Sequence, residues 1–281
     1  MTEGARRPDW IRVRAPYGER VEAVSAALAR HGLRTVCREA RCPNVGECWG
    51  GGTATVILLG GVCTRGCAFC SVTAGTPAPP DPTEPDRVAR AAAELGWRHV
   101  VVTSVTRDDL EDGGAGHFAQ VVGALRREAP SAAVELLVPD FRGDEGALRT
   151  VVDAAPDILA HNVETVPRLY PVVRRGAEYG RSLELLRRAA EMRPSLPLKS
   201  GIMVGFGEKE EEVVAVFRDL FGAGCRSVTV GQYLPPSRKH LPLAGYVTPE
   251  RFAALAAEAR RIGFETVLSG PLVRSSYKAG G

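Results

Sequence analysis

The sequence predicts an α/β fold in which a mostly parallel sheet is covered by helices. Short apolar segments alternate six times with amphipathic segments along the chain. The apolar segments are almost continuously hydrophobic, which is typical of strands that are buried on both faces. Such strands, separated by helices, form either an α/β barrel or an open doubly wound sheet. Six strand–helix units are fewer than the eight that close a complete barrel.

The predicted strands are short apolar runs, each bounded by turn residues. The first run ends in two glycines, the second is rich in valine, and the third ends at a proline. The six segments are ATVILLGG (54–61), WRHVVVTSV (97–105), AAVELLVP (132–139), PDILAHNV (156–163), LPLKSGIMVGF (196–206) and RSVTVGQYL (226–234).

The predicted helices lie between these strands and after the last one. Their apolar residues recur at helical spacing, so that each helix has one face to bury against the sheet. The segment APPDPTEP (78–85) precedes the first of them and is a stiff, proline-rich loop. The predicted helices span 86–96, 117–129, 145–155, 182–192, 210–224 and 249–263.

Composition is that of an ordinary soluble globular protein. The chain has 281 residues, of which 44% are hydrophobic and 25% charged, with a formal net charge of +3. The basic residues are scattered, which argues against a nucleic-acid partner. No apolar run approaches the length of a membrane span, and the first residues, MTEGARRPDW, contain no apolar signal region. We therefore expect a cytoplasmic protein that binds neither nucleic acid nor membrane.

Six of the seven cysteines form two triplets, Cys37, Cys42 and Cys48, then Cys63, Cys67 and Cys70. Disulfides are disfavoured because the cysteine count is odd and the chain is long enough to bury a core. Structural zinc is disfavoured because neither triplet contains the fourth ligand that such a site needs. The isolated Cys225 is predicted to be a small buried apolar residue.

The second triplet, in CTRGCAFC, favours a catalytic iron–sulfur cluster. Three thiolates within eight residues can bind three irons of a cubane cluster, so that the fourth iron remains open to a small molecule. The triplet directly follows the first predicted strand, and catalytic residues of α/β barrels lie at the carboxyl ends of strands. Gly60, Gly61 and Gly66 would allow the backbone to bend closely around the cluster.

The C-x3-C-x2-C spacing in this context resembles that of the radical S-adenosylmethionine (SAM) superfamily. Further segments are similar to the lipoyl synthase family within it, from about Trp10 to the last residue. They are CREARCPNVGECWGGGTATVILLGGVCTRGCAFCSV, TSVTRDDLEDGGAGHF, HNVETV, GIMVGFGE, GQYLPPS and RSSYKAG. The resemblance implies a partial (β/α)6 TIM-like barrel at 54–265, an N-terminal extension at 1–53 and a C-terminal tail at 266–281.

The same resemblance implies two [4Fe–4S] clusters. Cys63, Cys67 and Cys70 would hold the cluster that binds and cleaves SAM. The first triplet would hold an auxiliary cluster in the N-terminal extension, and this cluster would donate sulfur. Its fourth ligand would be Ser276 of the RSSY segment in the tail, with Ser275 as the alternative.

SAM contacts are also expected at the ends of the predicted strands. Phe69 would line the adenine pocket, and Thr103 and Ser104 match the superfamily's position for the methionine amino group. Each of these could equally serve packing, because strand ends carry both kinds of residue. The remaining expected contacts are Asn162, Glu164, Arg174, Met203, Gln232 and Tyr233.

The resemblance finally implies the reaction, which is sulfur insertion at carbons 6 and 8 of a protein-bound octanoyl-lysine. The partners would be an octanoylated lipoyl carrier domain, of a 2-oxoacid dehydrogenase or the glycine cleavage H protein, and a ferredoxin or flavodoxin reductant. Radical chemistry is needed because the saturated chain has no acidic C–H bond that a side chain could deprotonate. The alternative is another radical SAM sulfur inserter, either biotin-synthase-like or a methylthiotransferase.

Overall fold

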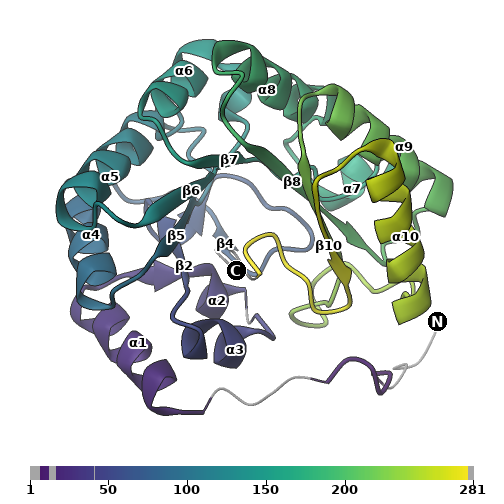
Figure 1. The fold of residues 1–281 in the computed structure, drawn as a ribbon, viewed down its shortest axis with the longest axis horizontal. Helices are drawn as coiled ribbons and strands as arrows, with labels where there is room; N and C mark the ends of the chain where they lie inside the picture. Colours follow the sequence, from purple (N-terminus) through teal and green to yellow (C-terminus); the bar gives the residue numbers. More distant parts are fainter. Residues whose placement is uncertain (1–6, 13–16, 41, 278–281) are drawn as a thin grey trace.

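The computed structural model describes residues 7–12, 17–40 and 42–277. Its main sheet contains eight strands in the order β1-β2-β5-β6-β7-β8-β9-β10, and every pair after β1–β2 is parallel. The sheet curves into a barrel that is open between β1 and β10 in the described part of the chain (Figure 1). Its strands are β1 (Arg34–Thr35), β2 (Thr55–Leu58), β5 (His99–Ser104), β6 (Ala133–Leu137), β7 (Ile158–Ala160), β8 (Leu198–Val204), β9 (Ser227–Gln232) and β10 (Thr266–Gly270).

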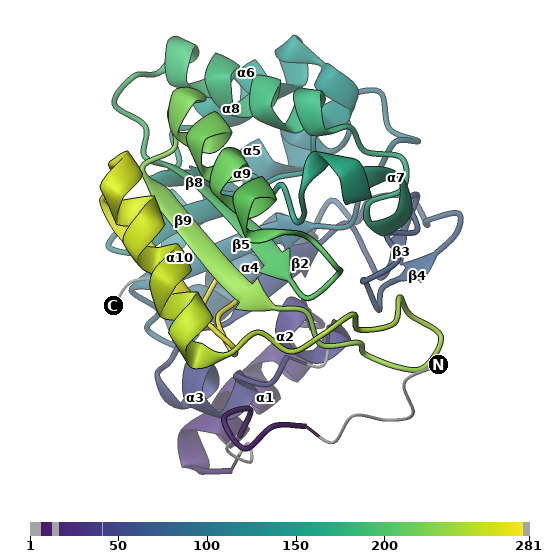
Figure 2. The same ribbon diagram turned by 90° about the vertical axis from the view of Figure 1, so that its right-hand side faces the viewer.

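Helices form an outer layer around this sheet (Figures 1 and 2). The barrel helices are α4 (Glu84–Glu94), α5 (Ala115–Glu128), α6 (Glu145–Asp153), α8 (Tyr179–Met192), α9 (Glu210–Gly222) and α10 (Pro249–Ile262). The remaining helices are α1 (Glu19–Arg30), α2 (Val36–Glu39), α3 (Val45–Gly50), α7 (Tyr170–Val173) and the 3-10 turns η1 (Phe141–Gly143) and η2 (Pro167–Leu169). None of the described helices is long and apolar enough to cross a bilayer.

Local sequence explains where the barrel helices begin and end. The Asp144 side chain accepts a hydrogen bond from the Ala147 backbone N–H at 2.7 Å and so caps α6. Thr248 caps α10 in the same way, and Pro249 occupies its first turn, where no N–H partner is needed. Gly263 ends α10 with a φ of +122°, which a residue with a side chain rarely adopts.

The core lies between the sheet and its helices. Val100, Val102, Val134 and Leu136 are fully buried, because the strands that carry them are covered on both faces. Cys225 belongs to the same core, as predicted. The predicted α/β fold class is confirmed, and all six predicted strands and all six predicted helices are present.

The seventh parallel strand, β10, is absent from the sequence prediction. Only Val267 of its five residues is buried, so the segment lacks the apolar run that marks the other strands. It pairs with β9 along its whole length, from Thr266 with Ser227 to Gly270 with Gly231. The predicted tail, 266–281, therefore begins with a strand of the main sheet, and residues 278–281 lie outside the described part. The division of the chain at 53 and 265 remains a prediction.

Candidate functional site

The second cysteine triplet lies in a loop at the carboxyl end of β2. A small parallel pair, β3 (Val62–Cys63) and β4 (Thr73–Ala74), closes the loop at its base. Figure 2 shows this pair beside α7, on the side toward which β8 and β9 point. The Ala68 N–H donates to the Val173 carbonyl at 3.0 Å, and the Ala68 carbonyl accepts from the Leu241 N–H at 3.0 Å. Distant segments thus fix the loop on both sides.

The thiols of Cys67 and Cys70 are suited to binding a metal and poorly suited to ionising in water. Burial raises the pKa of Cys67 to about 12, and burial also raises the pKa of Cys70. A thiol in such a place stays protonated until a metal replaces the proton, since a coordinating metal deprotonates the thiol outright. All three cysteines of the triplet are only partly exposed, so the loop offers its sulfurs at the mouth of the barrel.

Two buried polar atoms at the ends of β5 and β7, which flank β6 in the sheet, have no hydrogen-bond partner in the described residues. They are Ser104 Oγ, at the end of β5, and Asn162 Oδ1, just after β7. The Asn162 amide group donates to Glu164 at 3.1 Å and to Ser275 at 3.2 Å, so only its oxygen is left. An unpaired buried acceptor or hydroxyl is costly. These atoms are therefore fitted to receive a polar ligand.

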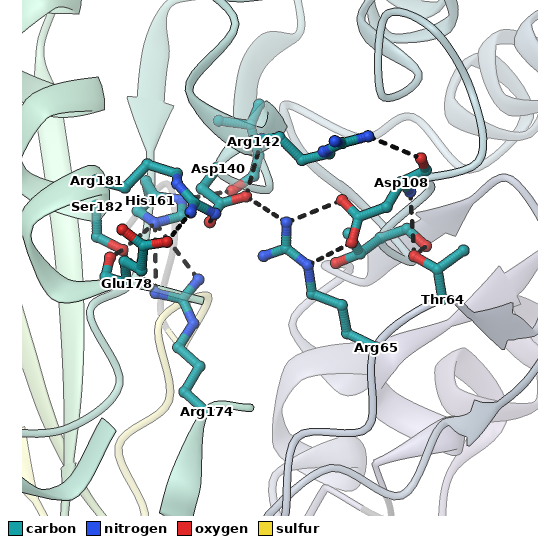
Figure 3. A network of polar contacts seen from close by, with 12 residues as sticks. Thr64, Arg65, Asp108, Asp140, Arg142, His161, Arg174, Glu178, Arg181 and Ser182 are labelled. Carbon is teal, nitrogen blue, oxygen red and sulfur yellow. Dashed lines mark hydrogen bonds and ion pairs between the residues drawn. The ribbon is translucent and has the colours of Figure 1, made fainter. Parts of the chain in front are cut away.

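Arg174 places a half-buried cation near the end of β7. Its guanidinium donates to the neutral Tyr170 and Ser182 hydroxyls, at 3.1 and 2.9 Å, beside His161 (Figure 3). Burial lowers the pKa of His161 to about 3, so this imidazole is neutral and cannot add positive charge. No carboxylate of the described residues forms a direct ion pair with Arg174, although Glu164 lies close enough to act on its charge. An anionic ligand could therefore pair directly with this guanidinium.

Other expected contact residues already use their polar groups within the protein. The Thr103 hydroxyl of β5 donates to the Leu137 carbonyl of the adjacent β6 at 2.7 Å. The Gln232 amide nitrogen donates to the carbonyls of Val204, Tyr233 and Gly245, and its oxygen accepts from the Val247 N–H. Gln232 therefore holds the loop that follows β9, and of the pair at the end of β5 only Ser104 has an unused hydroxyl.

A small apolar cluster covers one side of the cysteine loop. Val173, Phe206 and Tyr233 form its buried centre, and Phe69 and Met203 pack against it. The rings of Phe206 and Tyr233 stack with centroids 4.3 Å apart, while the Tyr233 hydroxyl donates to the Leu241 carbonyl at 2.7 Å. This surface can accept a flat ring beside the cluster loop. Phe206 was missed in the sequence analysis, although it stands in the singled-out segment GFGE.

The first triplet lines a second pocket, which is partly open to solvent. Cys37 comes from α2, Cys42 from the loop after it, and Cys48 from α3. Ser276 and Arg274 of the tail line the same pocket, whereas Ser275 does not. No three His, Cys, Asp or Glu of the described residues surround a single ion position. A cubane cluster needs no such point, since each thiolate binds a different iron.

The tail reaches this pocket by crossing the open side of the barrel. Asn44 donates from its amide group to the Leu272 carbonyl at 2.6 Å, and the Tyr277 hydroxyl donates to Glu47 at 3.0 Å. Both contacts tie the tail to the segment that carries the first triplet. Gly231 of β9 provides the passage, because a Cβ at this position would lie 2.1 Å from the Val273 carbonyl oxygen.

Replacing Gly231 with alanine is expected to displace the tail. The added methyl group cannot coexist with the Val273 carbonyl, and overpacking of this kind costs about 1–3 kcal/mol. We expect a lower free energy of unfolding in urea together with loss of iron from the first-triplet site. Gly245→Ala is the matched control, since a Cβ there meets open space. Equal stability and iron content in both variants would contradict this route of the tail.

Several charged residues near the cysteine loop were missed in the sequence analysis. Arg65, inside the CTRGCAFC segment, lies between the carboxylates of Asp108 and Asp140 (Figure 3). Burial alone would raise the pKa of Asp140, but Arg65 lowers it to about 2. Arg274 lines the pocket of the first triplet, and the charges of Cys42 and Glu164 oppose the lowering of its pKa by desolvation. No local spacing signals these contacts, although TRDDL and RSSY were both singled out.

Comparison with known proteins identifies the superfamily to which this chain belongs. The model of the Radical SAM superfamily matches residues 57–220. Methylornithine synthase has the same fold, with a TM-score of 0.54 at 14% identity over 94% of this chain and 86% of that chain. Coproporphyrinogen III oxidase of Escherichia coli gives a TM-score of 0.53 at 15% identity over 74% of this chain and 52% of that one. The chain thus belongs to the radical SAM superfamily, and the matched residues include the cysteine loop.

Relatives that match nearly the whole chain identify its family within this superfamily. Lipoyl synthase of Alkaliphilus metalliredigens is 53% identical over 98% of this chain and 94% of its own length. Lipoyl synthase of Methylococcus capsulatus is 55% identical over 98% of this chain and 85% of its own. That of Caldanaerobacter subterraneus is 54% identical, over 98% and 96% respectively. The chain belongs to the lipoyl synthase family of the radical SAM superfamily.

Proposed function

We propose that this chain inserts two sulfur atoms, at carbons 6 and 8, into a protein-bound octanoyl-lysine and so produces lipoyl-lysine. One observation in the structure carries the proposal beyond family membership. The tail brings Ser276 into the pocket that Cys37, Cys42 and Cys48 line, although more than two hundred residues separate them in sequence. No observation favours a biotin-synthase-like enzyme or a methylthiotransferase.

The radical SAM family implies a [4Fe–4S] cluster and SAM, and the residues present fit both. We assign Cys63, Cys67 and Cys70 as the ligands of that cluster. The unpaired oxygens of Ser104 and Asn162 and the half-buried guanidinium of Arg174 suit the ammonium and carboxylate groups of the methionine moiety. When bound and reduced, the cluster and SAM supply a deoxyadenosyl radical that can take hydrogen from an unactivated C–H bond.

The chain's own residues then have separate tasks. Phe69, Met203 and Tyr233 form an apolar wall that would keep water from the ring of the ligand. Asn162 holds Glu164 and Ser275 together, so that SAM contacts and tail share one hydrogen-bonded unit. Thr103 and Gln232 act through the backbone they hold, as their own polar groups are engaged.

For the second pocket we propose an auxiliary [4Fe–4S] cluster that serves as the sulfur source. Cys37, Cys42, Cys48 and Ser276 would be its ligands. A hydroxyl oxygen is a weaker partner than a thiolate for iron in sulfur surroundings. Ser276 would therefore leave one corner of the cluster labile, which suits a cluster that must give up sulfur.

The proposed partner is an octanoylated lipoyl carrier domain, of a 2-oxoacid dehydrogenase or the glycine cleavage H protein. A ferredoxin or flavodoxin would supply electrons, and the reaction would take place in the cytoplasm. We further propose that 1–53 and 266–281 act together, as extensions that complete the auxiliary site beside the barrel at 54–265.

Octanoyl-lysine in a carrier domain should be consumed by the anaerobically reconstituted enzyme with SAM and a reductant. Deuterium placed at carbons 6 and 8 of the octanoyl chain should appear in deoxyadenosine, measured by mass spectrometry, because hydrogen leaves from both positions. Free octanoate is the control substrate and should not react. Deoxyadenosine without deuterium from either carbon, or reaction of free octanoate alone, would reject the proposed substrate.

A further inference from the structure

Two backbone amides point at the sulfur of Cys63. The Arg65 N–H donates to Cys63 Sγ at 3.4 Å, and the Thr106 N–H donates to the same sulfur at 3.3 Å. Hydrogen bonds to a ligand sulfur are among the features that set the reduction potential of an iron–sulfur cluster. Donor dipoles stabilise the more negative, reduced state, so these two amides favour reduction.

The amides come from two different loops, and the Arg65 side chain joins those loops. Its Nε and Nη2 donate to the two carboxylate oxygens of Asp108 at 2.7 and 2.8 Å, in a bidentate pair. Its Nη2 also donates to Asp140 at 2.7 Å, and only 7% of the side chain is exposed. Figure 3 shows this guanidinium enclosed between the two carboxylates.

Thr64 adds a second connection between the same loops. Its backbone N–H and its hydroxyl both donate to the Thr106 carbonyl at 3.0 Å, while the hydroxyl accepts from the Asp108 N–H at 3.0 Å. Asp108 is two residues from Thr106, so the ion pair between Arg65 and Asp108 restrains the segment that carries the Thr106 amide. The position of that amide therefore depends on Arg65 together with Thr64.

Charge alone does not explain this arrangement. Asp140 also accepts from Arg181 at 3.3 Å, and Arg181 in turn pairs with Glu178, so that two guanidiniums face three carboxylates. The positive charge of Arg65 is therefore fully compensated within this group, whose bidentate pair adds geometric restraint. The influence of Arg65 on the site must then pass through the two loops.

We propose that Arg65 is a positioning residue that holds the Arg65 and Thr106 amides against the Cys63 sulfur and thereby raises the reduction potential of the cluster on Cys63, Cys67 and Cys70. The inference rests on the proposed assignment of these cysteines as ligands. It does not depend on the substrate, so a wrong substrate and a wrong role of Arg65 are distinguished.

The test replaces Arg65 with lysine, which keeps the charge but cannot form the bidentate fork. Cys37→Ala, Cys42→Ala and Cys48→Ala are introduced together in the full chain, so that only one cluster contributes to the electron paramagnetic resonance signal. In a reductive titration, the ratio of reduced to oxidised cluster at a fixed potential should fall about tenfold, which is 59 mV for a one-electron couple.

Arg168→Lys is the matched control. Arg168 forms an equivalent bidentate pair with Glu212, at 2.8 and 2.9 Å, on the exposed surface and outside the cysteine loop. Its replacement should leave the potential unchanged. An unchanged potential in Arg65→Lys as well, at normal iron content and circular dichroism, would overturn the proposal.

If the Arg65→Lys protein does not retain its cluster, Asp108→Asn tests the positioning role of Arg65 instead. Removing the negative charge of Asp108 near the cluster would by itself raise the reduction potential. Weakening the pair between Arg65 and Asp108, by contrast, would loosen the two amides and lower the reduction potential. We expect a lower potential in Asp108→Asn. A higher or unchanged reduction potential would show that the pair between Arg65 and Asp108 does not position the amides.

Discussion

Alanine at Cys63, Cys67 or Cys70 is expected to reduce SAM cleavage to background, whereas alanine at a cysteine of the first triplet should abolish only lipoyl product. The reason is spatial separation of the two sites. The second triplet lies in a loop beyond β2, and none of its members lines the pocket formed from α2, α3 and the tail. Each triplet can therefore be emptied without dismantling the other.

The measurement follows deoxyadenosine and lipoyl product in the same anaerobic reaction with octanoylated carrier domain. Cys225→Ala is the control, because Cys225 lies buried in the main core, far from either triplet in sequence. It should retain both products. Sulfur insertion by a reconstituted Cys37→Ala protein would show that the first triplet does not hold the sulfur donor.

Ser276→Cys should lower lipoyl product at least about tenfold while SAM cleavage continues. A fourth thiolate would bind iron more tightly than the hydroxyl does, so the auxiliary cluster should form and persist. The labile corner would then be lost, and release of sulfur would be blocked. Ser276→Ala should instead give a less stable cluster, measured as loss of iron and sulfide over time.

Ser275→Ala separates the two adjacent serines. The Ser275 hydroxyl lies 3.2 Å from the Asn162 amide nitrogen and is absent from the lining of the auxiliary pocket, whereas Ser276 is part of that lining. We therefore expect Ser275→Ala to keep the auxiliary cluster. Normal product from both Ser276 variants, with loss only in Ser275→Ala, would assign the ligand to Ser275. Normal product from all three variants would exclude a serine ligand.

Features that depend on neighbouring residues could be predicted from the sequence. Apolar periodicity predicted the six strands and six helices of the barrel, because strands and helices bury faces that repeat every two or every three to four residues. Within one loop, the close spacing of Cys63, Cys67 and Cys70 also limits which metal group three thiolates can share. The fold class and the family follow from these local patterns.

Features that depend on contacts between distant segments needed the tertiary structure. β10 lacks a strong apolar run and is a strand because the edge of β9 offers it hydrogen-bond partners. Ser276 approaches the first triplet only because Gly231 leaves room for the tail.

Whether a polar side chain has a hydrogen bond to spare is decided by the same distant contacts. Ser104 has an unpaired hydroxyl, whereas its neighbour Thr103 is bonded to the adjacent strand, and the amide of Gln232 is saturated by backbone groups. The hydrogen bonds of Arg65 to Asp108 and Asp140 likewise join residues from three separate loops. Local spacing cannot reveal such groups, because their partners are brought close only when the chain folds.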